Sequence, residues 1–191
     1  MAAASNRGLG HGGPLGECLL RVLGIDPGIA TCGFAVVDQG PGARRAAAVV
    51  FGAIRPHGPG DLKRLVELHR AIGQMIAEHA PGAAVVERLY HNRNVRTAAT
   101  VGQARGVILL ALAQAGVPVD EATPTEMKLA VAGYGGADKR QVGAMVAAQF
   151  GLPRPPTPDD AADALGLCLW WLQGRGLRAR LAGGTQGGGR M

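Results

Sequence analysis

The stretch Leu19-Leu-Arg-Val-Leu-Gly-Ile-Asp26-Pro-Gly28 decides the fold of this chain, because it has the pattern of a buried strand that ends at a carboxylate and a turn. A second strand, residues 32–38, follows after a very short connection, and a third, residues 46–54, follows the break at Gly40-Pro-Gly42. Connections this short favour antiparallel neighbours. The sequence therefore predicts three antiparallel strands, with Asp26 at the end of the first.

The second half of the chain alternates helices and strands. A helix from Asp61 ends at Pro81-Gly82, and a strand over 83–87, a helix over about 98–114 and a strand around 117–119 follow. Two more helices are predicted over 125–132 and 138–150, and a last one with Thr157 as its N-cap. Right-handed parallel crossovers follow from this order. The predicted fold class is α/β, a ribonuclease H-like mixed five-stranded sheet with helices on both faces.

Composition predicts one domain with two tails in this chain of 191 residues. Residues 1–17 and 174–191 are Gly-rich, and the second of these tails is dotted with arginine, so neither can bury enough apolar surface to offset its chain entropy. We expect a disordered N-terminal extension, a core domain over 18–173 and a flexible basic C-terminal tail. The formal net charge of +6 fits a polyanionic ligand. A genome that favours arginine, which makes up 17 of the 20 basic residues, is the alternative explanation of that charge.

The cysteines and the hydropathy indicate a cytoplasmic protein. Cys18, Cys32 and Cys168 are odd in number, lack CxxC spacing and lie in apolar segments, as reduced core thiols do. No run of 18 apolar residues and no signal-peptide core is found.

Four acids, Asp26, Glu87, Asp160 and Asp163, lie where apolar segments meet loops or open a helix. Three of them have an ordinary structural explanation: a turn at Asp26, helix capping at Asp160, and the favourable helix dipole for Asp160 and Asp163. A structural explanation is weaker for Glu87, because it directly follows the buried strand residues Ala-Ala-Val-Val. If the fold gathers the four, a divalent cation is the economical way to neutralise them, and pairs of such ions serve phosphodiester cleavage.

Four segments in order resemble the RuvC family of crossover junction endodeoxyribonucleases: Leu-Gly-Ile-Asp26-Pro-Gly, Val-Val-Glu87-Arg-Leu-Tyr90, Gly102-Gln-Ala-Arg-Gly106-Val and Asp160-Ala-Ala-Asp163-Ala-Leu. The resemblance covers roughly residues 22–171. It implies a homodimer that resolves Holliday junctions in recombination and DNA repair by paired symmetric nicks. It also implies two Mg²⁺ or Mn²⁺ ions per site, 5′-phosphate and 3′-hydroxyl products, and the RuvA–RuvB branch-migration complex as a partner.

The resemblance also assigns roles. Asp26 would bridge the two ions, Glu87 and Asp160 would each help to hold one, and Asp163 would complete the site; some relatives have His where this chain has Asp160. Tyr90 matches the position of an aromatic wedge at the junction, where many relatives have Phe. The DNA-binding residues predicted with it are Arg88, Arg93, Arg96, Arg105, Lys128, Lys139 and Arg140. The ordinary reading of residues 88–96 is a solvated loop.

Three other classes of protein remain possible on the sequence. An actin-like ATPase or sugar kinase shares the Gly-Ile-Asp26-Pro-Gly pattern but needs two duplicated domains, which one core without a repeat does not offer. A related nuclease, of the YqgF or transposase type, shares the fold and metal chemistry but not the whole motif set. A non-catalytic junction-binding protein gains nothing from four acids beside phosphates.

Overall fold

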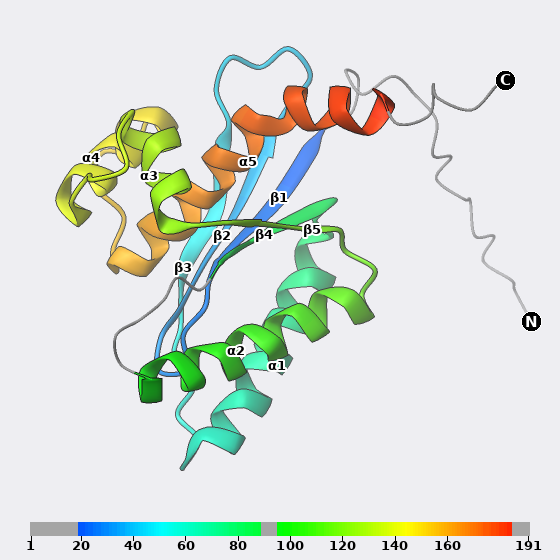
Figure 1. The fold of residues 1–191 in the computed structure, drawn as a ribbon, viewed down its shortest axis with the longest axis vertical. Coiled ribbons are helices and arrows are strands. Elements are labelled where there is room, and N and C mark those ends of the chain that lie inside the picture. Colours follow the sequence, from blue (N-terminus) through cyan, green and yellow to red (C-terminus); the bar gives the residue numbers. More distant parts are fainter. Residues whose placement is uncertain (1–18, 89–94, 185–191) are drawn as a thin grey trace, which may run out of the picture.

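A computed structural model gives the structure of residues 19–88 and 95–184, with side chains described except at 95–97 and 176–184. A five-stranded sheet in the order β3-β2-β1-β4-β5 lies at its centre (Figure 1). Its strands are β1 (Leu20–Asp26), β2 (Cys32–Gln39), β3 (Ala47–Ile54), β4 (Ala83–Glu87) and β5 (Val119–Ala122). The first three are antiparallel, and β4 and β5 extend the sheet in parallel with β1. The predicted mixed sheet is confirmed.

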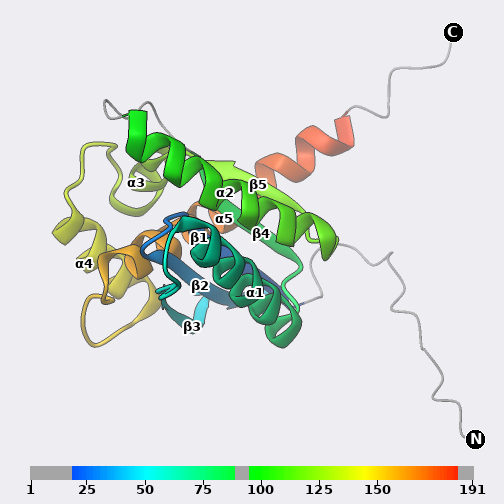
Figure 2. The ribbon, with the colours of Figure 1, turned by 90° about the horizontal axis from the view of Figure 1, so that it is seen from below.

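The helices cover both faces of the sheet. On one face, α1 (Asp61–His79) and α2 (Val95–Gln114) run side by side (Figure 2). On the other, α5 (Asp159–Gly184) crosses β1 and β2, and α3 (Pro124–Ala132) and α4 (Lys139–Phe150) pack against α5. The domain boundary predicted at residue 173 therefore falls within α5, which continues to Gly184.

Alternation along the strands divides the core into two clusters. On β1, Val22 packs with the α3–α5 side, whereas Leu23 and Ile25 pack with α1 and α2. A buried thiol lies on each side, Cys168 with the first cluster and Cys32 with the second. Burial raises the pKa of both thiols, that of Cys32 to about 12. Among the described residues, no helix is long and apolar enough to cross a membrane.

Several predicted boundaries differ from the structure, and three of them concern β5, α2 and α5. Strand β5 begins at Val119, not around residue 117, because Pro118 has no N–H to donate and contributes only its carbonyl, which accepts from Ala84 N at 2.8 Å. Helix α2 begins at Val95, before the predicted residue 98. The predicted N-cap at Thr157 is wrong: α5 begins at Asp159, and a cis peptide joins Thr157 to Pro158.

Candidate active site

Two of the four acids end neighbouring parallel strands. The pairing of β1 with β4 runs to Ile25 and Val86, so the next residue on each strand is an acid, Asp26 and Glu87. Side chains alternate along a strand, and Ile25 and Val86 both pack on the α1–α2 side. Asp26 and Glu87 therefore project to the opposite face, under α5.

Two glycines let α5 lie directly on the strands. A Cβ at Gly24 would collide with the carbonyl of Ala164 and lie 2.7 Å from the sulfur of Cys168. A Cβ at Gly33, on β2, would lie 2.9 Å from the Cβ of Asp160. This close approach brings the first turns of α5, with Asp160 and Asp163, over the ends of β1 and β4.

The electrostatics of Asp26 show that the other three acids lie close enough to affect its pKa. Burial is the largest cause that raises the pKa of Asp26 from 3.8 to about 9, and the charges of Glu87, Asp163 and Asp160 each raise it further. The side chains of Asp26 and Glu87 share a hydrogen bond, which raises the pKa of Asp26. Without a cation, burial and the neighbouring acids therefore favour a proton held by the Asp26–Glu87 pair.

The neighbouring acids respond in the same direction. Burial also raises the pKa of Glu87, although its hydrogen bond with Asp26 and the charges of Lys128 and Lys139 act against the rise. Burial likewise raises the pKa of Asp163, with Asp160 adding to the effect and the two lysines opposing it. The two lysines thus compensate only part of the negative charge of the four acids.

Two capped helices place these lysines. Helix α3 opens with a capping box in which the Thr123 side chain accepts from Glu126 N at 3.2 Å, and Lys128 follows in the next turn. Helix α4 opens with the same device between Asp138 and Gln141, and Lys139 is its first residue. The Nζ of Lys139 also lies 3.6 Å from a carboxylate oxygen of Asp159 in an exposed ion pair. Both lysines act electrostatically on Glu87 and Asp163, and their predicted contact with DNA stays a prediction.

Arg88 and Arg105 lie on the other face of the sheet. Glu121 on β5 stands between two residues that point toward α5, since Asp120 accepts from Trp171 Nε1 at 2.6 Å and Ala122 packs in the α5-side cluster. Glu121 therefore points toward α2, where it forms ion pairs with Arg105 and, at 3.5 Å, with Arg88. Glu121 was not predicted from the sequence, because an acid in a short edge strand has no motif of its own.

The remaining predicted residues divide into two groups. Arg140 is exposed on the first turn of α4, beside Lys139. Tyr90 and Arg93 lie outside the described residues, and Arg96 lies in α2 with its side chain not described. DNA contact by these residues, and by Arg88 and Arg105, stays a prediction.

The four carboxylates are suitable ligands for a hard divalent cation, although they are not arranged around a single ion position in this structure. Four carboxylates supply the oxygen ligands that Mg²⁺ and Mn²⁺ take, and a cation would relieve the repulsion that raises the pKa of Asp26. Within residues 19–88 and 95–184, no three His, Cys, Asp or Glu side chains are close enough to hold one ion as they stand. Magnesium commonly keeps several of its waters and binds through one or two carboxylates.

Comparisons with known proteins agree with this geometry. The RuvC family model, described as crossover junction endodeoxyribonuclease RuvC, matches residues 22–170. A RuvC from Chloroflexus aggregans is 52% identical over 151 residues, covering 78% of this chain and 91% of the relative. A RuvC from Salinispora arenicola is 44% identical over 176 residues, covering 90% of this chain and all of the relative.

Solved structures give the same result. The structure of Thermus thermophilus RuvC matches with a TM-score of 0.75 and 33% identity, over 83% of this chain and 96% of that one. The same protein in complex with a Holliday junction substrate matches with a TM-score of 0.73. A mixed sheet with acids at its adjacent strand ends, closed by a helix that carries two more, defines a phosphodiester-cleaving nuclease of the ribonuclease H type. Within that class, this chain belongs to the RuvC family of crossover junction endodeoxyribonucleases.

Proposed function

We propose that Asp26, Glu87, Asp160 and Asp163 hold two Mg²⁺ or Mn²⁺ ions in this endodeoxyribonuclease. The observation that carries the proposal is the pKa of Asp26, raised to about 9 by burial and by the three other acids. A buried group of like charges costs stability unless a cation is bound, so a site of this kind is built for its ligand. By the family resemblance, Asp26, Glu87 and Asp160 would hold the ions and Asp163 would complete the set.

The ions, when bound, activate a water for in-line attack and stabilise the charge that develops on the phosphodiester. The chain's own residues orient the substrate. Lys128 and Lys139 lie close enough to Glu87 and Asp163 to lower the pKa values of these acids. The scissile phosphate must bind beside the same acids. Both lysines therefore attract the phosphate backbone of the strand to be cut. Cleavage of that strand produces a 5′-phosphate end and a 3′-hydroxyl end.

The substrate we propose is the four-way junction. The relative from Thermus thermophilus was solved with a Holliday junction substrate, and this chain shares 29% identity with it in that complex. Arg88, Arg93, Arg96, Arg105 and Arg140 bind arms of the junction in this proposal, and Tyr90 stacks on a base at its centre. Paired symmetric nicks in recombination and repair, and cooperation with the RuvA–RuvB complex, complete the proposed role.

Paired nicks need two active sites, and we propose that the outer surface of α1 and α2 forms the homodimer interface. The α1–α2 patch consists of Leu62, Val66, Val107 and Leu110. Leu62 is 81% exposed and Leu110 is 52% exposed. Val66 and Val107 line one groove of about 250 Å³ between the two helices. Exposed apolar side chains grouped in this way are typical of an interface.

The decisive experiment compares a synthetic four-way junction with a linear duplex of matching sequence, each with Mg²⁺, Mn²⁺ or EDTA. We expect symmetric paired nicks in the junction alone, abolished by EDTA and by Asp26→Asn. Asp38→Asn is the matched control, since Asp38 is paired with Arg21 on β1 and β2. Equal cleavage of junction and duplex, or cleavage that persists in EDTA, would sink the proposal.

A further inference from the structure

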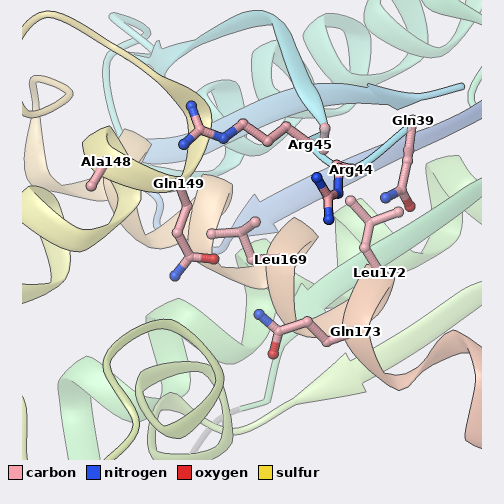
Figure 3. A pocket seen from close by; sticks show the side chains of 9 residues that line it. Gln39, Arg44, Arg45, Ala148, Gln149, Leu169, Leu172 and Gln173 are labelled. Carbon is pink, nitrogen blue, oxygen red and sulfur yellow. The ribbon is translucent and has the colours of Figure 1, made fainter. Parts of the chain in front are cut away.

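A second cavity, of about 400 Å³, lies away from the acids, where the β2–β3 loop meets α4 and α5 (Figure 3). It is separate from the active site along α5. Leu169 and Gln173 line it and follow Asp163 by six and ten residues, which corresponds to roughly 9 and 15 Å of helix. Gln39, at the far end of β2 from the acids, also lines it.

The rim of this cavity is positively charged without a counter-ion. Arg44 and Arg45 both line it, both are exposed, and no Asp or Glu is among its lining residues. Neither arginine forms an ion pair in the described part of the chain. Arg45 lies over the C-terminal end of α4, with Nη1 3.8 Å from where a Cβ on Gly151 would be. The guanidinium groups of these two neighbouring residues point in different directions (Figure 3), so each is available to its own carboxylate or phosphate.

The other walls have the chemistry of a peptide site. Leu172, which is partly exposed, and the edge of Leu169, which is 7% exposed, form an apolar floor below the arginines (Figure 3). The amide of Gln149 donates to Val131 O at 2.8 Å and that of Gln173 donates to Ala130 O at 3.2 Å, so both amides are oriented by α3. Their carbonyl oxygens remain as acceptors for the backbone N–H groups of an extended chain.

We propose that this cavity binds an acidic peptide segment of another protein, with two carboxylates on Arg44 and Arg45 and an apolar side chain on Leu169 and Leu172. Charge complementarity selects an acidic occupant, and the leucines favour a peptide over nucleic acid, since a phosphate backbone gains nothing from an apolar floor. The chain's own ends do not fit. Residues 1–18 contain only one acid, Glu17, and residues 174–191 contain none.

The test is a phage-display selection of random nine-residue peptides on the full-length protein. Phage are first depleted on an Arg44→Glu, Arg45→Glu variant. We expect selected peptides to carry at least two Asp or Glu beside Leu, Ile or Phe. By fluorescence anisotropy, their dissociation constants should rise at least tenfold in the variant.

The matched control is an Arg55→Glu, Arg154→Glu variant, which has the same net charge and alters two exposed arginines that do not line the cavity. Its peptide affinity should stay within about twofold of wild type. Junction cleavage by the cavity variant should remain normal, which separates this proposal from the catalytic one. The proposal is overturned if no peptide distinguishes wild type from the cavity variant, if both variants lose affinity equally, or if the cavity arginines are needed for junction binding instead.

Discussion

At the scale of single residues, Asp26 carries the conflict between stability and function. Its carboxyl group is buried among three acids, so the charge that cleavage needs is the charge that folding resists. We predict that Asp26→Asn lowers junction cleavage by about a thousandfold or more, because a proposed metal ligand is lost. The same change should stabilise the metal-free protein by at least about 1 kcal/mol, because it removes a carboxyl group whose ionised form the folded site disfavours.

Cleavage of a labelled junction and thermal unfolding in EDTA measure the two effects. A variant that is inactive but less stable than wild type in EDTA would contradict the electrostatic explanation. Mg²⁺ should raise the unfolding temperature of wild type more than that of the variant, since a bound ion stabilises only the folded state.

The pH dependence of stability has a defined sign. The pKa of Asp26 is about 9 in the folded protein and 3.8 as a free side chain, so the unfolded state releases this proton first as pH rises. The group therefore lowers stability progressively from about pH 4 to about pH 9. We predict that the difference in unfolding temperature between Asp26→Asn and wild type, measured in EDTA, grows between pH 5.5 and 8.5. A difference independent of pH would show that Asp26 is ionised throughout.

At the scale of elements, the position of α5 depends on one missing side chain. We predict that Gly24→Ala destabilises the protein by about 1–3 kcal/mol, because the new methyl group overlaps the Ala164 carbonyl and the Cys168 sulfur. Cleavage should fall as well, since α5 carries Asp160 and Asp163. Gly73→Ala on α1 is the control: no atom lies within 4 Å of the place its new methyl group would take, and the change should stabilise by about 0.5–1 kcal/mol. Chemical denaturation measures both changes.

The second element-scale prediction concerns the Glu121 ion pairs between β5, β4 and α2. Glu121→Gln leaves Arg105 without its carboxylate, and the side chain of Arg105 is only 23% exposed, with Nε buried and unpaired. We predict a loss of stability of about 1–3 kcal/mol, measured by urea unfolding. Glu78→Gln, at an exposed position on α1, is the control and should change stability by less than about 0.5 kcal/mol. Equal effects of the two substitutions would assign no structural role to these ion pairs.

The elements also show what the sequence could predict. Apolar runs that end at Asp26 and Glu87 were predicted correctly because burial and turn residues are local signals. The start of α5 was predicted wrongly, because the cap that Thr157 suggested is only a local signal, whereas the helix begins at Asp159, with Asp160 packed on Gly33 of β2. The approach of Lys128 and Lys139 to the acids depends on how α3 and α4 dock on α5, which no local pattern encodes.

At the scale of the whole molecule, the α1–α2 patch is the surface that we propose joins two active sites in a homodimer. We predict that Leu110→Glu converts the protein to a monomer in analytical ultracentrifugation and replaces paired nicks with single ones, because a charge cannot be buried at the interface. Leu129→Glu, on α3 and 56% exposed, is the control and should leave the mass and the cleavage pattern unchanged. A wild-type protein that stays monomeric at micromolar concentration would rule out the proposed interface.

The reactivity of the two buried thiols would reveal when the helices separate from the sheet. Their raised pKa values leave almost no thiolate at neutral pH, so alkylating reagents should react with them only when the surrounding layer separates from the sheet. Cys32, on β2, lies under α1 and α2, and Cys168, on α5 itself, faces the sheet. In a Cys18→Ser background, the order in which the two are labelled would tell which layer detaches first, and whether divalent ions slow the release of α5 alone.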